Sequence, residues 1–181
     1  QDLGMSFHEK TFRRIDRTFA FIDLSGFTAY ADEHGDAAGM EIINGFRNSV
    51  RLVAAQKGVR IAKWLGDGAM LVGVEPEQTV EAVIEMEGLI DLSQSPLPMR
   101  AGIATGPVLL IDGDDHVGRA VILASRLCDM AGPHQVLAPA SMAMALMVNT
   151  AVRKIGEHSI PGFAEPFELV QLTSRDESLG R

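Results

Sequence analysis

The sequence predicts a single α+β domain in which strands and helices follow one another in the order βαββαβ, with further strands toward the C-terminus. Three observations support this fold class. Short apolar runs bounded by glycine, proline or aspartate are typical of buried strands. Longer segments repeat their apolar residues at helical spacing. At 181 residues the chain is also long enough to bury a substantial core without disulfides.

The predicted elements of the first half are a strand, an interrupted helix, a hairpin and a second helix. In order, we expect a polar lead-in at 1–17, a strand at 18–23, a helix from Thr28 to about 56 with a break near Gly35, strands at 59–65 and 69–74 around Gly66-Asp67-Gly68, and a helix at 77–92. The Gly-Asp-Gly sequence between two apolar runs is good hairpin chemistry.

The second half continues with strands and a further amphipathic helix. We expect strands at 99–105 and 108–111 joined at Gly106-Pro107, an acidic loop at 112–115, a helix at 117–131, a strand at 135–138, a small helix at 140–147, and strands at 151–158 and 167–172. This order predicts a ferredoxin-like sandwich over 18–173 with added C-terminal strands, and helices on one face of a mainly antiparallel sheet. The polar residues 174–181 are expected to form a disordered tail.

The composition limits the class of protein. A net charge of −8 argues against nucleic-acid binding, which needs a basic surface, whereas a nucleotide needs only local cations or a metal. The single Cys128 cannot form an internal disulfide, which indicates a cytoplasmic setting. No apolar stretch is long enough to span a bilayer and no signal peptide is evident, so we expect no membrane segment within the chain.

Two aspartates stand where an apolar run meets glycine. Asp23 ends the first predicted strand, and Asp67 lies in the hairpin turn. Either residue alone is explained by a turn, Asp23 as a cap of the next helix and Asp67 as a hairpin residue. Two carboxylates brought together at strand ends would repel one another unless a cation lay between them. Mg²⁺ prefers one or two carboxylates plus substrate phosphates, so the pair predicts a divalent metal site.

The sequence surroundings of two cationic residues, Lys63 and Arg126, do not by themselves indicate a function. Lys63 interrupts an apolar strand, where lysine usually marks a sheet edge or reaches to solvent, and a buried lysine there would need an acceptor. Arg126 lies on the side of the 117–131 helix away from its apolar residues, together with Ile122 and Arg119. Taken alone, Arg126 reads as a solvated surface charge.

Together these segments resemble the catalytic domain of the class III adenylyl and guanylyl cyclases over residues 18–172. Four motifs carry the resemblance: Phe21-Ile-Asp-Leu-Ser-Gly-Phe-Thr28, Lys63-Trp-Leu-Gly-Asp-Gly68, Arg100-Ala-Gly-Ile-Ala-Thr-Gly-Pro-Val108 and Gly118-Arg-Ala-Val-Ile-Leu-Ala-Ser-Arg-Leu127. Each motif alone is moderately specific, and the four at these separations are strongly so.

The resemblance implies a role for each matching residue. Asp23 and Asp67, assisted by the carbonyl of Ile22, would bind two divalent ions, Mg²⁺ or Mn²⁺. Lys63 and Asp115 would read the adenine ring, with Asp112 and Asp114 as neighbouring alternatives to Asp115. Arg126 would stabilise charge on the reacting phosphate. The N–H groups of Gly26, Phe27 and Thr28, at a helix start, would meet the β- and γ-phosphates.

Two positions depart from the family's pattern. The asparagine that orients the ribose is replaced by Ile122, and the lysine that grips the triphosphate is replaced by Pro161. A hydrogen-bond donor and a cation are therefore missing, although neither change touches the metal residues. These departures favour slow catalysis.

The resemblance thus implies an adenylate cyclase that converts ATP into 3′,5′-cyclic AMP and pyrophosphate. The family builds its site between two chains, Asp23 and Asp67 from one and Lys63, Asp115 and Arg126 from the other, which implies a homodimer. A non-catalytic nucleotide-binding regulatory module of the same fold is the alternative. A guanylate cyclase is a third option, which the resemblance disfavours because guanylyl cyclases usually carry Glu and Cys in place of Lys63 and Asp115.

Overall fold

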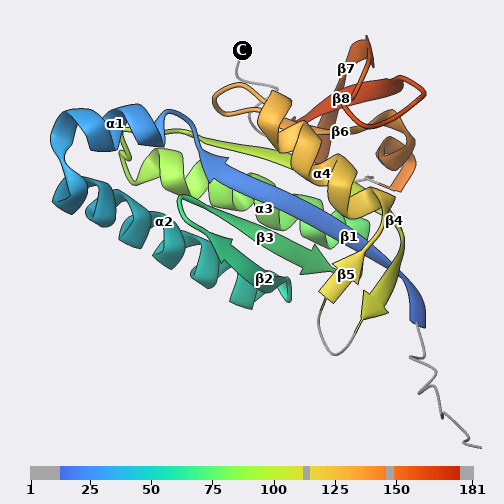
Figure 1. Ribbon diagram of the computed structural model, residues 1–181, viewed down its shortest axis with the longest axis horizontal. Coiled ribbons are helices and arrows are strands. Elements are labelled where there is room, and N and C mark those ends of the chain that lie inside the picture. Colours follow the sequence, from blue (N-terminus) through green and yellow to red (C-terminus); the bar gives the residue numbers. More distant parts are fainter. Residues whose placement is uncertain (1–12, 112–114, 146–148, 176–181) are drawn as a thin grey trace, which may run out of the picture.

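A computed structural model describes residues 13–111, 115–145 and 149–175 (Figure 1). Its elements, in chain order, are β1 (Arg13–Leu24), α1 (Phe27–His34), α2 (Asp36–Lys57), β2 (Arg60–Leu65), β3 (Gly68–Gly73), α3 (Pro76–Leu92), β4 (Met99–Ile111), β5 (Asp115–Val117), α4 (Arg119–Met130), β6 (Val136–Pro139), the 3₁₀ helix η1 (Ala140–Ala145), β7 (Thr150–His158) and β8 (Phe167–Ser174). No helix in these described ranges is both long and apolar enough to cross a membrane.

The strands form one sheet whose centre has the predicted βαββαβ arrangement. The order is β2-β3-β1-β4-β6-β8-β7, and β5 pairs with β4. The first four of these strands have the order of a ferredoxin-like sheet, and the last three extend it, as predicted. Every pairing is antiparallel except that between β4 and β6. The central strands β1 and β4 thus lie between the β2–β3 hairpin and the C-terminal extension.

Helices cover both faces of the sheet, which corrects the expectation that they would lie on one face (Figure 1). On β1, Ala20 and Ile22 pack into the core formed with α2 and α3, whereas Phe19 packs into a second core formed with α4. Successive residues of a strand point to opposite faces. A central strand that is apolar on both faces therefore needs a helix on each side.

Most predicted elements are present, with differences at their bounds. The break near Gly35, the hairpin and α3 are confirmed. However, β1 begins at Arg13, five residues before its predicted start. The helix α4 begins at Arg119, because residues 115–117 form β5 and Gly118 is the N-cap residue of the helix.

The predicted break at Gly106-Pro107 is wrong, since β4 runs through it without interruption. Pro107 pairs with Asp16 of β1 on one side, while β6 and β5 pair with other parts of β4. Among the described strands, β4 is therefore an edge at this point, which is where a proline without an N–H is tolerated.

At the C-terminal end, β8 runs to Ser174, two residues beyond its predicted end, and the Arg175 N–H donates to the Asn149 carbonyl at 3.1 Å. The expectation that the disordered tail begins at residue 174 is therefore wrong for these two residues. The expectations for most of the lead-in, for Asp112 and Asp114, for the end of the small helix and for residues 176–181 of the tail lie outside the described residues.

Candidate active site

Asp23 lies near the end of β1, in the middle of the sheet. It shares a strand face with Phe19 and Phe21, because side chains alternate along a strand. This face is the one that α4 covers, since Phe19 packs against α4. In the register of the sheet, Asp23 is opposite Gly68 on β3 and opposite Arg100 on β4. The sheet therefore holds Asp23 rigidly between two neighbouring strands.

Gly68 approaches β1 so closely that no other residue fits there. A Cβ atom on Gly68 would lie 2.5 Å from the carbonyl oxygen of Ile22 and 2.9 Å from the Cβ of Asp23. Real Cβ atoms do not approach other atoms this closely, so any side chain would push β1 away. The absence of a side chain on Gly68 therefore lets β3 lie close to the Ile22 carbonyl and the Asp23 side chain.

Asp67 lies in the turn that joins β2 to β3. Its carbonyl oxygen accepts a hydrogen bond from the Leu24 N–H at 3.2 Å, which ties the turn to the end of β1. Burial raises the pKa of the Asp67 carboxyl, and the negative charge of Asp23 raises it further, while a backbone hydrogen bond and Arg100 oppose the rise. The structure therefore brings Asp23 and Asp67 close enough for their charges to interact.

Arg100 contacts the same site, and the sequence reasoning gave it no role. Its Nε and Nη2 donate to Oδ1 and Oδ2 of Asp23 at 2.6 and 3.1 Å. Its Nη1 donates to the carbonyl oxygens of Asp129 and Ala131 at 3.0 and 3.4 Å, near the end of α4. A cation does lie beside Asp23, as the charge argument required, and it is a guanidinium. The only signal in the sequence was the place of Arg100 at the start of the third motif.

The oxygen atoms gathered here fit a hard divalent cation. The donors are the Asp23 and Asp67 carboxylates and the Ile22 carbonyl, and Gly68 lies beside Ile22 and Asp23. Across the described ranges, no group of three or more His, Cys, Asp or Glu side chains could hold a metal. Mg²⁺ is usually held by one or two carboxylates together with substrate phosphates, so a two-carboxylate site suits Mg²⁺ or Mn²⁺ that arrives with a nucleotide.

Lys63 and Asp115 form an ion pair, although 51 positions of sequence separate the two segments that carry them. The Lys63 Nζ lies 3.2 Å from Oδ1 of Asp115. Lys63 belongs to β2, an edge strand of the sheet, and Asp115 opens β5, which pairs with the end of β4. The ring of His116, the next residue, lies edge-on to Phe19 of β1. The β4–β5 hairpin therefore reaches back across the α4 face of the sheet toward β2.

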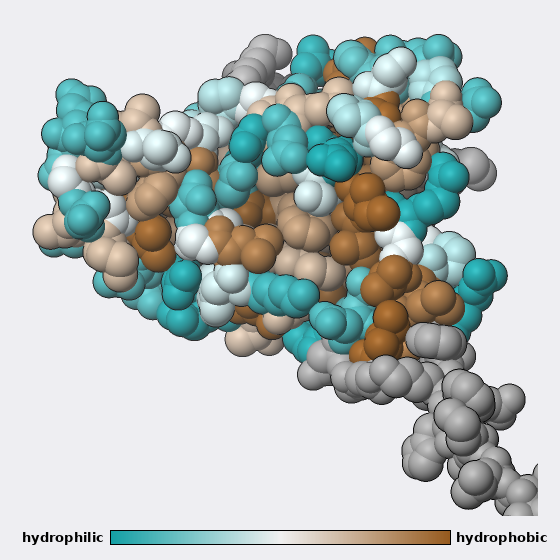
Figure 2. All heavy atoms as spheres, in the orientation of Figure 1, coloured by the Kyte–Doolittle hydropathy of each residue, from teal (hydrophilic) through white to brown (hydrophobic). Residues whose placement is uncertain are grey.

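The Lys63–Asp115 pair borders a cavity of about 210 Å³ with an apolar wall. Phe21, Met70 and Val121 contribute to that wall. Figure 2 shows apolar side chains gathered on this side of the molecule, over α4, the β2–β3 hairpin and β5. Both charged side chains are more than half exposed, at 56% and 68%, so the ion pair itself adds little stability. An apolar wall with one donor and one acceptor is suited to a flat heterocycle.

The start of α1 is open to an anion. Gly26 is the N-cap residue, and no side chain of the described residues caps the helix. The following Phe27 and Thr28 begin the helix. The Ser25 hydroxyl oxygen is buried without a hydrogen-bond partner among the described residues. N–H groups at a helix start that lack a side-chain cap can bind phosphate.

The outer face of α4 carries Arg126, Ile122 and Arg119, one helical turn apart. Arg126 is exposed and forms no hydrogen bond or ion pair with another described side chain. Ile122 is 49% exposed, so its side chain is not part of this chain's core. The guanidinium of Arg119 stacks over Phe163 at 5.1 Å. A cation thus lies beside the β7–β8 loop in which Pro161 replaces the expected lysine.

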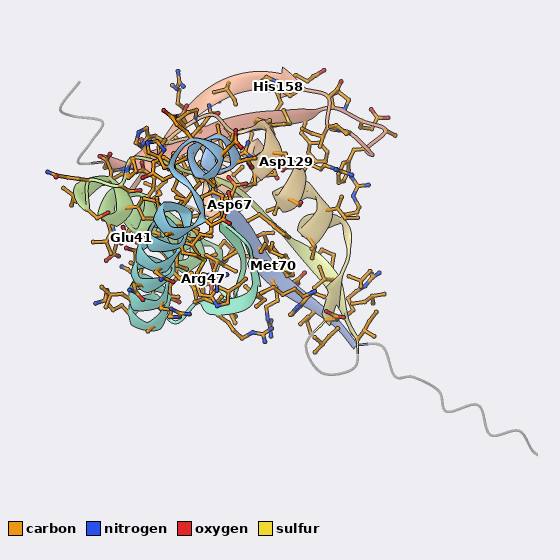
Figure 3. The ribbon with its side chains drawn as sticks, turned by 60° about the vertical axis from the view of Figure 1, so that its left-hand side comes forward. Glu41, Arg47, Asp67, Met70, Asp129 and His158 are labelled. Carbon is orange, nitrogen blue, oxygen red and sulfur yellow. The ribbon has the colours of Figure 1, made fainter. Side chains whose placement is uncertain are left out.

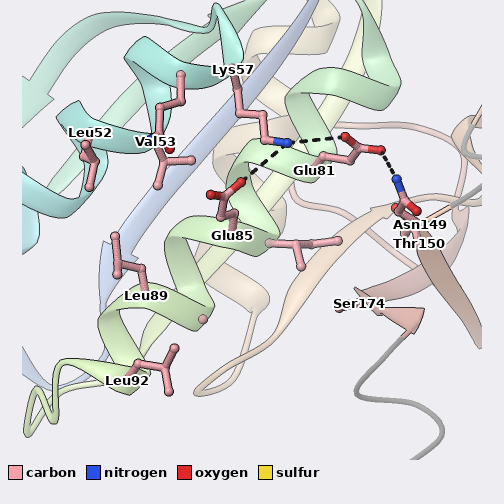
Figure 4. A pocket seen from close by; sticks show the side chains of 13 residues that line it. Leu52, Val53, Lys57, Glu81, Glu85, Leu89, Leu92, Asn149, Thr150 and Ser174 are labelled. Carbon is pink, nitrogen blue, oxygen red and sulfur yellow. Dashed lines mark hydrogen bonds and ion pairs between the residues drawn. The ribbon is translucent and has the colours of Figure 1, made fainter.

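A larger cavity, of about 590 Å³, lies elsewhere, between α2, α3 and the ends of β7 and β8 (Figure 4). Lys57 there is placed between Glu81 and Glu85, with Nζ–Oε2 distances of 3.7 and 3.5 Å. None of the predicted site residues lines it. The predicted site residues on β1, β2 and α4 therefore lie on the opposite side of the sheet from the larger cavity.

Cys128 does not take part in the site chemistry. It is 4% exposed, and burial raises the pKa of its thiol far above the usual range. A thiol that stays protonated is a poor nucleophile and a poor metal ligand.

No family model matches the chain, but its sequence is similar to curated proteins. An uncharacterised protein of Mycobacterium tuberculosis is 34% identical over 152 residues, which is 84% of this chain and 40% of that protein. A pH-sensitive adenylate cyclase of M. tuberculosis is 33% identical over 71% of this chain and 32% of its own. An adenylate cyclase of Streptomyces coelicolor is 30% identical over 74% and 35%, respectively. The chain thus spans about two fifths or less of these relatives.

Solved structures with the same fold include both kinds of nucleotidyl cyclase. The adenylyl cyclase CyaB of Pseudomonas aeruginosa superposes with a TM-score of 0.79 at 24% identity, covering 90% of this chain and 96% of its own. The guanylate cyclase domain of a rhodopsin-guanylyl cyclase from Catenaria anguillulae, in complex with GTP, gives 0.78 at 19% identity, covering 90% and 99%. The fold alone therefore does not distinguish ATP from GTP. The chain has the fold of the class III adenylyl and guanylyl cyclase catalytic domains, and its sequence relatives include adenylate cyclases.

Proposed function

We propose that this domain is an adenylate cyclase that converts ATP into 3′,5′-cyclic AMP and pyrophosphate. The observation that carries the proposal is the proximity of the Asp23 and Asp67 carboxylates beside the Ile22 carbonyl, where Gly68 lets β3 lie close to β1. The Lys63–Asp115 pair at an apolar-walled cavity on the same side of the sheet supports adenine as the base, with Lys63 as donor and Asp115 as acceptor.

In the reaction, the ribose 3′ oxygen attacks the α-phosphorus in line, the 3′ hydroxyl loses its proton, and the bond to pyrophosphate breaks. Two bound divalent ions would lower the pKa of that hydroxyl and neutralise charge on the phosphates. Asp23 and Asp67 would hold these ions. The N–H groups at the start of α1 would bind the β- and γ-phosphates. Arg126 would stabilise the charge that develops on the reacting phosphate.

The proposed site is shared by two copies of the chain. Arg126 and Ile122 project from the outer face of α4, and the cation that contacts Asp23 within one chain is Arg100 rather than Arg126. A second copy that brings its α4 to the carboxylates would supply Arg126, and its Lys63–Asp115 pair would supply base recognition. The assembly we propose is a homodimer with two equivalent sites.

A non-catalytic nucleotide-binding module remains a second candidate because of Ile122 and Pro161. An exposed isoleucine cannot donate a hydrogen bond to ribose, and a proline cannot grip a triphosphate. Such a module would bind ATP without turnover. A guanylate cyclase is the third option, against which the Lys63–Asp115 pair argues.

One assay separates these functions. Purified protein is incubated with ATP or GTP and with Mn²⁺ or Mg²⁺, and cyclic nucleotide is measured, with Asp23→Ala and Asp67→Ala as inactive controls. Cyclic AMP formation that both substitutions abolish supports the proposal. ATP binding without product, in protein shown to be dimeric, would support the regulatory module. Near-normal turnover of either aspartate variant at saturating Mn²⁺ would disprove the two-metal site.

A further inference from the structure

Asp67 lies between two peptide groups that are hydrogen-bonded to two different elements. The carbonyl oxygen of Asp67 accepts from the Leu24 N–H at the end of β1, at 3.2 Å. The carbonyl oxygen of Gly66 accepts from Nη2 of Arg47 on α2, at 3.3 Å. The φ and ψ angles of Asp67 are the rotations between these two peptide planes. Holding both planes therefore fixes the direction of the Asp67 Cα–Cβ bond, from which the carboxylate projects.

Arg47 is itself held in place by the strand that precedes the turn. Its guanidinium stacks over the ring of Trp64 on β2, with the central carbon 4.9 Å from the ring centroid. Figure 3 shows Arg47 on α2 and Asp67 at the end of the β2–β3 hairpin. Stacking on an aromatic ring leaves the edge of a guanidinium available to donate hydrogen bonds in the plane of the guanidinium itself. Trp64 thus orients the donor that reaches Gly66.

The Cβ position of Gly66 makes no packing contact that would hold the turn in addition to these hydrogen bonds. Gly66 adopts a φ of 64°, in the left-handed region that favours glycine. A Cβ atom on Gly66 would meet nothing within 4 Å. Because the space at that position is open, we expect the 66–67 peptide to rotate more freely when the hydrogen bond from Arg47 is removed.

We propose that Arg47 is a positioning residue for Asp67, which it holds in the orientation that binds a divalent ion. This inference rests on the proposed function, because it takes Asp67 to be a metal ligand. Arg47 does not contact the metal or the nucleotide; it acts through the Gly66 carbonyl. Residues that orient a metal ligand typically affect metal affinity by about 10- to 100-fold when they are replaced.

The chain offers a matched control in Arg51, one helical turn further along α2. Its guanidinium also stacks over Trp64, at 5.0 Å, but among the described residues its hydrogen bonds do not include the Gly66–Asp67 turn. Replacing Arg51 removes a similar charge and a similar stacking contact while leaving the turn intact. Trp64 is the single tryptophan of the chain, so its fluorescence reports both substitutions directly.

The experiment measures Mn²⁺ binding by the full chain, with unbound Mn²⁺ detected by electron paramagnetic resonance. Wild type, Arg47→Met, Arg47→Lys, Arg51→Met and Asp67→Ala are compared, and thermal unfolding verifies that each is folded. We expect Arg47→Met to weaken Mn²⁺ binding about tenfold, Arg51→Met to leave it unchanged, and both to alter Trp64 fluorescence. Arg47→Lys serves as a second folded variant, and we expect it to weaken binding as well, since lysine lacks the stacked, oriented donor.

The outcomes separate this inference from the proposed function. If wild type binds no Mn²⁺ either alone or with a non-hydrolysable ATP analogue, or if Asp67→Ala binds it as wild type does, the metal site is wrong and the role of Arg47 falls with it. If Asp67→Ala weakens binding but Arg47→Met does not, or if Arg51→Met weakens it equally, only the positioning role is wrong.

Discussion

Arg100 and Asp23 form a two-point ion pair across neighbouring strands. Nε donates to Oδ1 at 2.6 Å, Nη2 donates to Oδ2 at 3.1 Å, and the two residues are directly opposite in the β1–β4 register. Both side chains are about three-quarters buried, with 26% and 24% exposure. The carboxylate that we propose as a metal ligand therefore already has a cationic partner, so a metal ion must share Asp23 with Arg100 or displace it.

We predict that Arg100→Met destabilises the metal-free protein and strengthens Mn²⁺ binding. Hydrogen bonds to charged groups contribute about 1.5–3 kcal/mol, and partial exposure should place the loss near the lower end of that range. Without the guanidinium, Mn²⁺ no longer competes for Asp23. Urea unfolding with and without Mn²⁺ measures both effects. Unchanged stability in the absence of metal would show that the pair contributes nothing.

We predict that Asp67→Asn stabilises the metal-free protein at neutral pH and removes its response to Mn²⁺. The folded-state pKa of Asp67 is raised, first by burial and then by Asp23. A raised carboxyl pKa means that the charged form is disfavoured by folding, so stability is lost as the pH rises from the unfolded-state pKa through the folded-state pKa. The advantage of Asp67→Asn should therefore vanish below about pH 4.

Stability measured against pH for wild type and Asp67→Asn checks this prediction. Since a metal binds the ionised carboxylate, Mn²⁺ affinity of the wild type should fall as the pH drops through the raised pKa of Asp67. An advantage of Asp67→Asn that grows toward low pH would have the wrong sign and would contradict the prediction.

We predict that ATP is preferred over GTP, and that Lys63→Glu combined with Asp115→Cys shifts the preference toward GTP. A site that hydrogen-bonds one base leaves its groups unpaired with another, and such a mismatch can reach about 10⁴-fold. Because both side chains are more than half exposed, we expect a smaller but clear preference. The ratio of kcat/KM for the two nucleotides is the measurement. Equal or greater cyclic GMP formation by wild type would refute the assignment of Lys63 and Asp115.

We predict that mixing two inactive variants, Asp23→Ala and Arg126→Ala, restores partial activity. In a mixed dimer, one of the two sites would contain an intact Asp23 and an intact Arg126. Specific activity of the wild type should also rise with protein concentration as the dimer forms. Absence of recovery, in a mixture whose subunits are shown to exchange, would count against a shared site.

We predict that the wild type is a slow cyclase and that Ile122→Asn raises its turnover with ATP more than it changes apparent binding. Ile122 lies one turn before Arg126 and its side chain is half exposed. A lost positioning hydrogen bond typically costs about 0.5–1.5 kcal/mol, and misplacement of a reacting group can lower the rate by up to about 10²-fold.

The alternative for Ile122 is that it packs against the second chain of the dimer, in which case asparagine would weaken the dimer. Thermal unfolding and sedimentation of the variant, beside its steady-state kinetics, distinguish the two. A folded, dimeric Ile122→Asn protein with unchanged or lower turnover would show that another group positions the ribose.

The sequence by itself determined the order of most elements, the hairpin around Asp67 and the position of Asp23 near the end of the first strand. These depend on local signals: apolar periodicity, glycine and proline at turns, and motif spacing. The same signals gave a wrong prediction of a strand break at Pro107. A proline is tolerated within a strand where no neighbouring strand needs its N–H, and that depends on where β5 and β6 pair with β4.

Only the tertiary structure decided which side chains meet. Arg100 contacts Asp23 because the β1–β4 register places them opposite one another. Asp115 reaches Lys63 because the β4–β5 hairpin folds back across the sheet. Arg47 reaches Gly66 because α2 packs beside β2. Each contact joins segments far apart in the chain, and its geometry depends on strand register and helix packing, which no local sequence pattern specifies.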